Sequence, residues 1–140
     1  MEKHDLKLLM DAVRHVGHGF HRQFNSVAAG TGLKGHHVRY LAALRRSSLT
    51  AKELSDHLRV DKGHTSRVLA ELTALGLVER VSESRGAPLT LTAEGYALSE
   101  ALDANIGLLA GRVADSISDE DFAAFMRVAT TVEEILKEEM

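Results

Sequence analysis

Residues 50–76, TAKELSDHLRVDKGHTSRVLAELTALG, contain the start and stop signals of two short helices. Thr50 and Glu53 form a capping box, in which the Thr50 hydroxyl accepts from the Glu53 amide and the Glu53 side chain accepts from the Thr50 amide. The Asp61 carboxylate can accept from the free amides of a second helix. Gly76 stands where a helix ends in a left-handed residue. Two short helices joined by a tight turn are typical of a helix-turn-helix.

The second helix of this pair has one apolar and one polar face. Its apolar residues recur at helical spacing, which predicts that they are buried: Val68, Leu69, Leu72 and Leu75. Its outer face carries small or hydrogen-bonding side chains near the N-terminus: Lys62, Gly63, His64, Ser66 and Arg67. Helix-turn-helix proteins contact DNA with this part of the second helix. On the two helices alone, an ordinary helical hairpin without a DNA-binding role is the alternative.

Two short extended runs follow the second helix. They span residues 77–80 and 87–91 and are separated by the polar loop VSESRG. A helix-turn-helix followed by such a hairpin is a winged helix. The tip would be Arg85, which could enter a minor groove or contact a phosphate. Pro88 lies in the returning run, where it fits only at a sheet edge because it lacks a backbone donor.

We expect the DNA contacts of this winged helix to divide between bases and phosphates. Base contacts are expected from His64, Ser66 and Arg67, and Arg67 could pair with a guanine in the major groove. Gly63 would allow close approach to the duplex. Phosphate contacts are expected from cationic side chains on and around the second helix: Lys62, Arg67, Lys52, Arg45, Arg46 and Arg85.

The charge distribution agrees with this placement, although the chain as a whole has a net charge of −3. Residues 33–86 hold ten basic and six acidic residues, a balance of +4. Residues 87–140 hold three basic and eleven acidic residues, a balance of −8. The basic excess therefore coincides with the expected DNA-binding segment. Solvated helix faces could produce the same gradient without any partner.

The sequence LTAKELSDHLRVDKGHTSRVLAELTALGLVERV at 49–81, together with Arg85 and LTLTAEGYAL at 89–98, resembles the MarR family of bacterial transcription regulators. The resemblance covers the middle half of the chain. It implies a mainly α (α+β) winged helix-turn-helix fold, a DNA-binding repressor, and a homodimer formed by the terminal helices. The wing departs from the family pattern, because it is shorter than usual and its tip is reduced to Glu83-Ser84-Arg85-Gly86.

The size of the chain predicts one domain over residues 1–140. The resemblance implies that this is a MarR-type domain, with a DNA-binding lobe at 33–91 and a helical dimerisation region at 1–32 and 92–140. Three flanking helices are expected to bury apolar stripes. The first, 5–27, carries Leu6, Leu9, Val13, Val16, Phe20 and Val27. The helix after Thr92 carries Leu98, Leu102, Ile106, Leu109 and Val113, and the helix after Ser118 carries Phe122, Phe125, Met126, Ala129, Val132 and Leu136.

Two copies paired through these helices would hold their DNA-binding helices roughly 34 Å apart, one turn of B-DNA. We therefore expect a pseudo-palindromic operator. A monomer whose terminal helices close on each other is the alternative.

Composition limits the other classes of function. There is no cysteine, which excludes disulfides, thiol nucleophiles and cysteine-ligated zinc. No apolar run approaches the length of a membrane span and the N-terminus lacks a signal-peptide pattern, so a cytoplasmic location is expected. No motif of enzymatic catalysis is recognisable, so we expect no enzyme and no required cofactor. A winged-helix adaptor for a protein partner would need a neutral or acidic outer face, whereas this one is basic.

Eight histidines suggest two kinds of regulatory site. Asp11, His15 and His18 lie at helical spacing on the first helix and could ligate zinc, with a further ligand from elsewhere. The resemblance implies instead a small anionic aromatic effector between the dimer helices and the DNA-binding lobe. That site would be lined by His15, His18, Arg22, His37 and Tyr40, and Arg22 or a charged histidine would hold the anion. Surface histidines with no regulatory role are the third reading.

Overall fold

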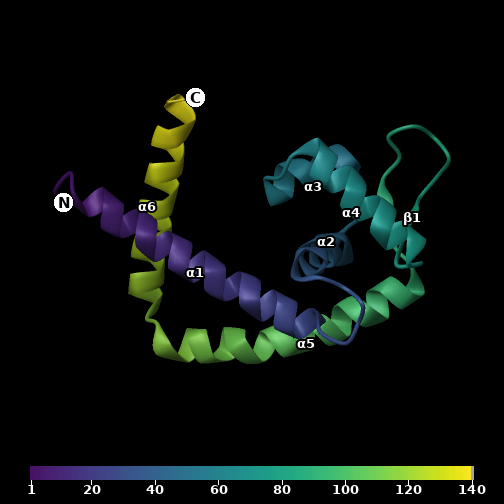
Figure 1. Ribbon diagram of the computed structural model, residues 1–140, viewed down its shortest axis with the longest axis horizontal. Coiled ribbons are helices and arrows are strands. Elements are labelled where there is room, and N and C mark those ends of the chain that lie inside the picture. The colour runs from purple at the N-terminus through teal and green to yellow at the C-terminus, as the bar shows by residue number, and fades with distance from the viewer. Residues whose placement is uncertain (140) are drawn as a thin grey trace. The chain divides into compact units, whose positions relative to one another are not determined.

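The computed structural model describes residues 1–139. Its helices are α1 (Asp5–Ala28), α2 (Gly35–Arg46), α3 (Ala51–Leu58), α4 (Lys62–Ala74), α5 (Ala93–Ser116) and α6 (Asp119–Glu138), and its strands are β1 (Val78–Arg80) and β2 (Leu89–Leu91) (Figure 1). The chain divides into two compact units, residues 1–106 and 107–140. The order of elements in the first unit is that of a winged helix, so the predicted fold class is confirmed.

Capping interactions set the ends of α3 and the start of α4. Thr50 Oγ1 accepts from the Glu53 amide at 3.1 Å, and Glu53 Oε1 accepts from the Thr50 amide at 3.0 Å. α3 ends at Leu58, and the C-cap residue Arg59 has a φ of 56°, which places it in the left-handed region. Asp61 Oδ1 then accepts from the His64 amide at 2.6 Å. The helix-turn-helix therefore forms at the residues that the sequence predicts.

The end of α4 directs the chain into the wing. Gly76 adopts a φ of 74°, a conformation that favours glycine. The Leu77 amide donates to the Leu72 carbonyl at 3.0 Å, and both leucines are buried. This closing bond satisfies a carbonyl that the end of a helix leaves free. β1 begins at the next residue.

The wing is a two-stranded antiparallel sheet in which Val78 pairs with Leu91. Its strands are shorter than the runs at 77–80 and 87–91 that the sequence predicts. Pro88 precedes β2, and its carbonyl accepts from the Val81 amide at 2.9 Å. Leu49 forms an isolated bridge to Leu89, with hydrogen bonds of 3.1 and 2.7 Å in the two directions. The link before α3 thus acts as a minimal third strand.

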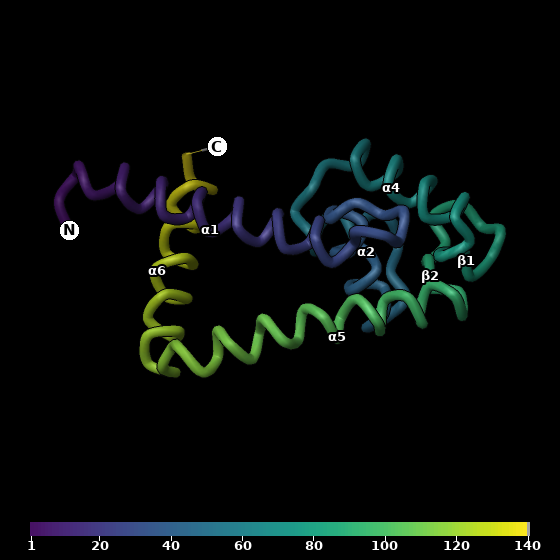
Figure 2. The backbone as a smooth tube through the Cα atoms, turned by 60° about the horizontal axis from the view of Figure 1, so that its bottom comes forward, coloured from purple at the N-terminus to yellow at the C-terminus, as the bar shows by residue number. Residues whose placement is uncertain are grey.

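α2 supplies much of the core of the first unit and contacts α1, α3 and β2. Figure 2 shows the neighbouring segments wrapped around it. Its most deeply buried side chains are Tyr40 and Leu41. The other hydrophobic residues of this core are Ala28, Leu33, Val38, Ala43, Leu44, Leu54, Val68, Leu69, Leu72, Leu77, Val78, Leu89 and Leu102. α4 therefore packs against this hydrophobic core.

α5 begins in close contact with the end of α4 and the start of the wing. Thr92 Oγ1 donates to the Gly76 carbonyl at 2.7 Å and accepts from the Gly95 amide at 3.0 Å. A Cβ atom at Gly95 would lie 2.0 Å from the Leu77 carbonyl oxygen. Only glycine allows this approach, so Thr92 and Gly95 fix where α5 starts.

The predicted burial of the terminal apolar stripes is wrong for the single chain. α1 buries only Ala28, and within residues 1–139 α6 buries no side chain. On α5, Leu102 is buried as predicted, whereas Val113 is exposed. Helical periodicity identifies the apolar face of a helix but not the element that covers it. Among the described residues, no helix is long and apolar enough to cross a membrane.

Candidate nucleic-acid interface

α4 separates a buried face from an exposed one. Its inner residues are buried: Thr65, Val68, Leu69 and Leu72. Four residues of its first turns are exposed, and we call them the α4 outer face: Lys62, Gly63, Ser66 and Arg67. The sequence predicts this division except at two residues: it does not single out Thr65 as buried, and Leu75, which it predicts to be buried, is 52% exposed at the C-terminal end of the helix. The α4 outer face presents two cations and a hydroxyl at one end of a helix.

A polar network beneath the α4 outer face joins three helices. Tyr40 Oη lies 2.8 Å from Nδ1 of His64 and 3.2 Å from Oγ1 of Thr65. The Ser55 hydroxyl donates to Thr65 Oγ1 at 2.8 Å. Buried hydroxyls need hydrogen-bond partners. Here every hydrogen bond joins residues of two different helices: α2 to α4, or α3 to α4. Ser55 and Thr65 could be suspected from sequence only as polar residues at apolar helical positions.

His64 has a different setting from the other expected base contacts. It is half-buried, and its Nδ1 atom is engaged by the Tyr40 hydroxyl. Base contact by His64 stays a prediction, and it would have to use Nε2. Ser66 and Arg67 are exposed.

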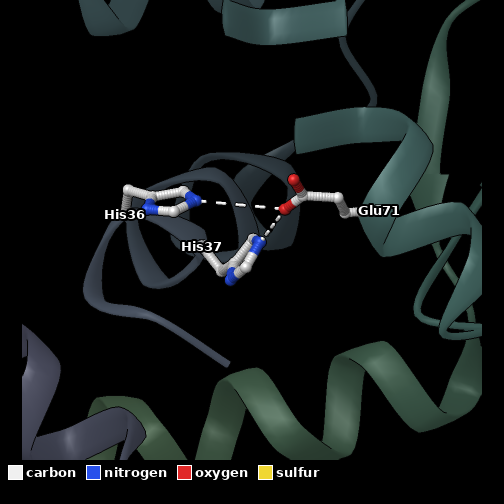
Figure 3. Close-up of side chains that lie close together, drawn as sticks. All are labelled: His36, His37 and Glu71. Atoms are coloured by element: carbon white, nitrogen blue, oxygen red, sulfur yellow. Dashed lines mark hydrogen bonds and ion pairs between the residues drawn. The ribbon is translucent and has the colours of Figure 1, made fainter. Parts of the chain in front are cut away.

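A second connection between α2 and α4 lies in the same region (Figure 3). His37 is buried, and its Nε2 atom lies 2.5 Å from Glu71 Oε2. His36 Nε2 lies 4.0 Å from the same oxygen. The hydrogen bond from His37 lowers the pKa of the Glu71 carboxyl. Burial, and after it the charge of His37, lowers the pKa of His36 below its ordinary value.

The cationic residues around α4 are not equivalent. Lys52, Arg46 and Arg85 are exposed. Arg45 Nη1 forms an ion pair with Asp103 at 3.0 Å, and its guanidinium lies 5.6 Å from the centroid of the Tyr96 ring. Hydrogen bonds with the Tyr96 and Asp103 side chains raise the Arg45 pKa. The predicted phosphate contact of Arg45 would therefore compete with two partners on α5.

The residues predicted for an effector site do not assemble into one pocket. His15, His18 and Arg22 line a shallow hollow of about 370 Å³ on α1 together with Arg14. His37 and Tyr40 do not line this hollow; their side chains bond to α4 instead. Sequence spacing indicates that these residues share helix faces, but not which helix each face meets.

The predicted zinc ligands on α1 are also not brought together. Asp11 Oδ1 accepts from Arg14 Nη2 at 2.9 Å. Within residues 1–139, the only group of three potential ligand side chains close enough to share an ion is a different one: His36, His37 and Glu71. The candidate metal centre therefore lies at the contact between α2 and α4, and not on α1 as the sequence predicts.

The capped helix pair, the wing and the cationic α4 outer face define a winged helix-turn-helix protein of the DNA-binding type. The model of the MarR family matches residues 31–87. The whole fold is also similar to that of solved MarR regulators, so the chain resembles the MarR family of transcriptional regulators in both its winged-helix segment and its architecture.

Solved structures of this family resemble the chain over most of its length. The reduced form of MarR from E. coli is 26% identical with a TM-score of 0.69, and the match covers 89% of this chain and 95% of that one. A MarR family protein of Mycobacterium tuberculosis is 25% identical with a TM-score of 0.62, covering 89% and 93%.

MarR of Staphylococcus aureus, in complex with salicylate and kanamycin, shares the fold at a TM-score of 0.80 and 17% identity, covering 99% and 96%. No curated protein matches the chain in sequence.

Proposed function

We propose that this protein is a sequence-specific DNA-binding transcriptional regulator that acts as a homodimer on a pseudo-palindromic operator. The observation that carries the proposal is the α4 outer face. Two cations, a hydroxyl and a glycine occupy the exposed first turns of a helix whose opposite face is packed into the core. This is the part of a helix-turn-helix that enters a major groove.

Each residue of the α4 outer face has a chemical task in this proposal. Arg67 pairs with a guanine edge, and Ser66 bonds to a neighbouring base or phosphate. Lys62 neutralises a phosphate, as do Arg46 and Lys52 outside α4. Gly63 leaves room for the duplex. Within the chain, a Cβ atom at this position would meet only the Asp61 carboxylate, at 3.3 Å. Arg85 in the wing contacts the adjacent backbone or minor groove.

Dimer formation is supported by the apolar faces of the terminal helices. On α1, Val13 and Val16 are more than half exposed, and on α6 the same is true of Phe122 and Phe125. Contiguous apolar surface of this kind is unusual on a monomer and is typical of protein–protein contacts. We infer that a second copy of the chain covers these faces, which would supply the second DNA-binding helix that a palindromic site requires.

We further propose that the protein is a repressor whose DNA binding is weakened by a small anionic aromatic compound. The hollow on α1 supports this, because Arg14 and Arg22 bring cationic groups to one shallow surface beside His15 and His18. Guanidinium groups bind carboxylates with good geometry. The S. aureus relative provides a further argument, since it was solved with salicylate bound. Calorimetric titration of salicylate against wild-type protein and Arg22→Ala tests this part of the proposal.

Selection of DNA fragments from a random pool tests the main proposal. We expect an enriched sequence with two inverted half-sites whose centres are about one helical turn apart. Sedimentation of the free protein should give the mass of a dimer. Recovery of no enriched sequence, with binding that is equal on all DNA, would contradict sequence-specific regulation. A monomeric species at micromolar concentration would contradict the palindromic arrangement.

A further inference from the structure

His36, His37 and Glu71 bring three metal-ligand atoms into one small volume between α2 and α4 (Figure 3). One ring nitrogen of each histidine and one carboxylate oxygen all lie within 4.8 Å of one another. Glu71 Oε2 is 2.5 Å from His37 Nε2 and 4.0 Å from His36 Nε2. Figure 3 shows both rings directed toward the carboxylate. All three residues lie on helices, His36 and His37 on α2 and Glu71 on α4, so the backbone holds them in place.

These separations are close to those of a tetrahedral metal centre. Zinc bonds of about 2.0–2.2 Å to nitrogen and oxygen place neighbouring ligand atoms roughly 3.3 Å apart. The two separations from Glu71 Oε2, 2.5 and 4.0 Å, lie on either side of that value. Small rotations of the Glu71 side chain, which is half-exposed, would make both separations suitable. Two imidazoles and one carboxylate form a ligand set that binds zinc and related divalent transition ions.

The surroundings of the cluster also fit an ion that enters from solvent. His37 is buried and fixed, while His36 and Glu71 are partly exposed and leave a route for entry. The Lys34 amide donates to His37 Nδ1 at 2.9 Å, so the proton of a neutral His37 ring sits on Nε2 and is donated to Glu71. Coordination through Nε2 requires the other tautomer, with the proton on Nδ1. The Lys34 amide and a protonated Nδ1 are both donors, so binding of the ion would break the hydrogen bond between them.

The geometry points to a binding site for one divalent transition metal ion, of which zinc is the best match, held by His36, His37 and Glu71. A water molecule completes the four ligands. The ion replaces the proton that His37 and Glu71 share and adds His36 to the connection. The site is distinct from the α1 histidines, which do not converge on one point.

The consequence for regulation depends on the proposed DNA-binding function. Glu71 lies on α4, about one turn beyond Arg67, and both histidines lie in the first turn of α2. An ion at this position would fasten the DNA-binding helix to the core helix and add positive charge beside it. We expect the loaded protein to bind its selected DNA more tightly, by about fivefold or more.

The test uses the full chain without a histidine tag, freed of metal by a chelator that is then removed. Calorimetric titration with ZnCl₂ should give one ion per chain. Titration with CoCl₂ should give the visible absorption bands of tetrahedral cobalt, with no thiolate contribution because the chain has no cysteine. His36→Ala and Glu71→Gln should each lower the affinity by more than about tenfold, since even outer partners of a metal site commonly have effects of that size. His21→Ala, an exposed histidine of α1, is the matched control.

Two results would overturn the metal site. One is the absence of saturable zinc or cobalt binding by the wild-type protein. The other is unchanged affinity in His36→Ala and Glu71→Gln, checked as folded by circular dichroism, with loss in His21→Ala. The DNA measurement is separate. A protein that binds cobalt through these residues but binds no DNA retains the site and loses the proposed function, whereas one that binds DNA but no metal shows the reverse.

Discussion

The hydroxyl of Tyr40, a core residue of α2, lies 2.8 Å from Nδ1 of His64 in the first turn of α4. This single contact links the largest fully buried side chain to the helix that carries the α4 outer face. It also shows why the position of that helix depends on residues that never touch DNA.

Replacing Tyr40 with phenylalanine should lower the free energy of unfolding by about 1–3 kcal/mol, because half-buried His64 and buried Thr65 both lose the Tyr40 hydroxyl as a hydrogen-bond partner. Urea denaturation followed by circular dichroism measures the loss. Tyr96→Phe is the matched control, since the chain has two tyrosines and Tyr96 is half-exposed. Equal losses in the two variants would show that the Tyr40 hydroxyl has no special role.

Replacing Arg67 with alanine should weaken binding to the selected operator by about 1–3 kcal/mol and change binding to scrambled DNA much less, because a base contact carries sequence information. Lys62→Ala should weaken binding to both DNAs and reduce the salt dependence by about one unit. Fluorescence anisotropy over a range of salt concentrations measures both effects. A similar loss on scrambled and selected DNA for Arg67→Ala would assign Arg67 to phosphate contact instead.

Gly95→Ala and Gly111→Ala form a matched pair on α5. The new methyl group at position 95 would meet the Leu77 carbonyl oxygen at 2.0 Å, so we expect a destabilisation of about 1–3 kcal/mol. At position 111 nothing lies within 4 Å, and alanine should stabilise the helix by about 0.5–1 kcal/mol. Thermal and urea unfolding of both variants decide this. The same sign of change at both positions would contradict the packing described for Gly95.

Glu53→Gln should make stability less dependent on pH in the acid range. Hydrogen bonds from the Thr50 amide and hydroxyl lower the pKa of Glu53 below its ordinary value of 4.5. A carboxyl with a lowered pKa stabilises the fold above the unfolded-state pKa, and this contribution disappears as the pH falls through the folded-state pKa. The difference between wild type and Glu53→Gln should therefore be largest near neutral pH and shrink below pH 4.5. Glu83→Gln, an exposed wing residue, provides the comparison in urea titrations at each pH.

Local chemistry explains how far sequence could predict this structure. The start of α3 depends on Thr50 and Glu53, which are three residues apart, and the end of α4 depends on Gly76. Such signals are complete within a few residues, so the helix-turn-helix was predictable in detail. The strands were predicted too long, because strand length depends on pairing between 78–80 and 89–91, which a local pattern does not contain.

The candidate sites were predictable only in part, because they require distances between helices. The position of Asp11 allows an ion pair with Arg14 as readily as a shared metal ion with His15 and His18, and the ion pair forms. His37 and Glu71 are 34 positions apart, and nothing local to either indicates their contact. Apolar periodicity likewise gave the faces of α1 and α6 but not their exposure in a single chain.

The bridge between Leu49 and Leu89 couples the segment that leads into the helix-turn-helix to the returning strand of the wing. Together with the contacts of Thr92 and Gly95, it ties both the start and the end of the helix-turn-helix to the wing. In the dimer proposed above, an effector bound on α1 would therefore move the helix-turn-helix and the wing together, whereas an ion at His36, His37 and Glu71 would act within the lobe, between α2 and α4. A change in the specificity for such an effector would then need substitutions on α1, while the residues of the α4 outer face could stay the same.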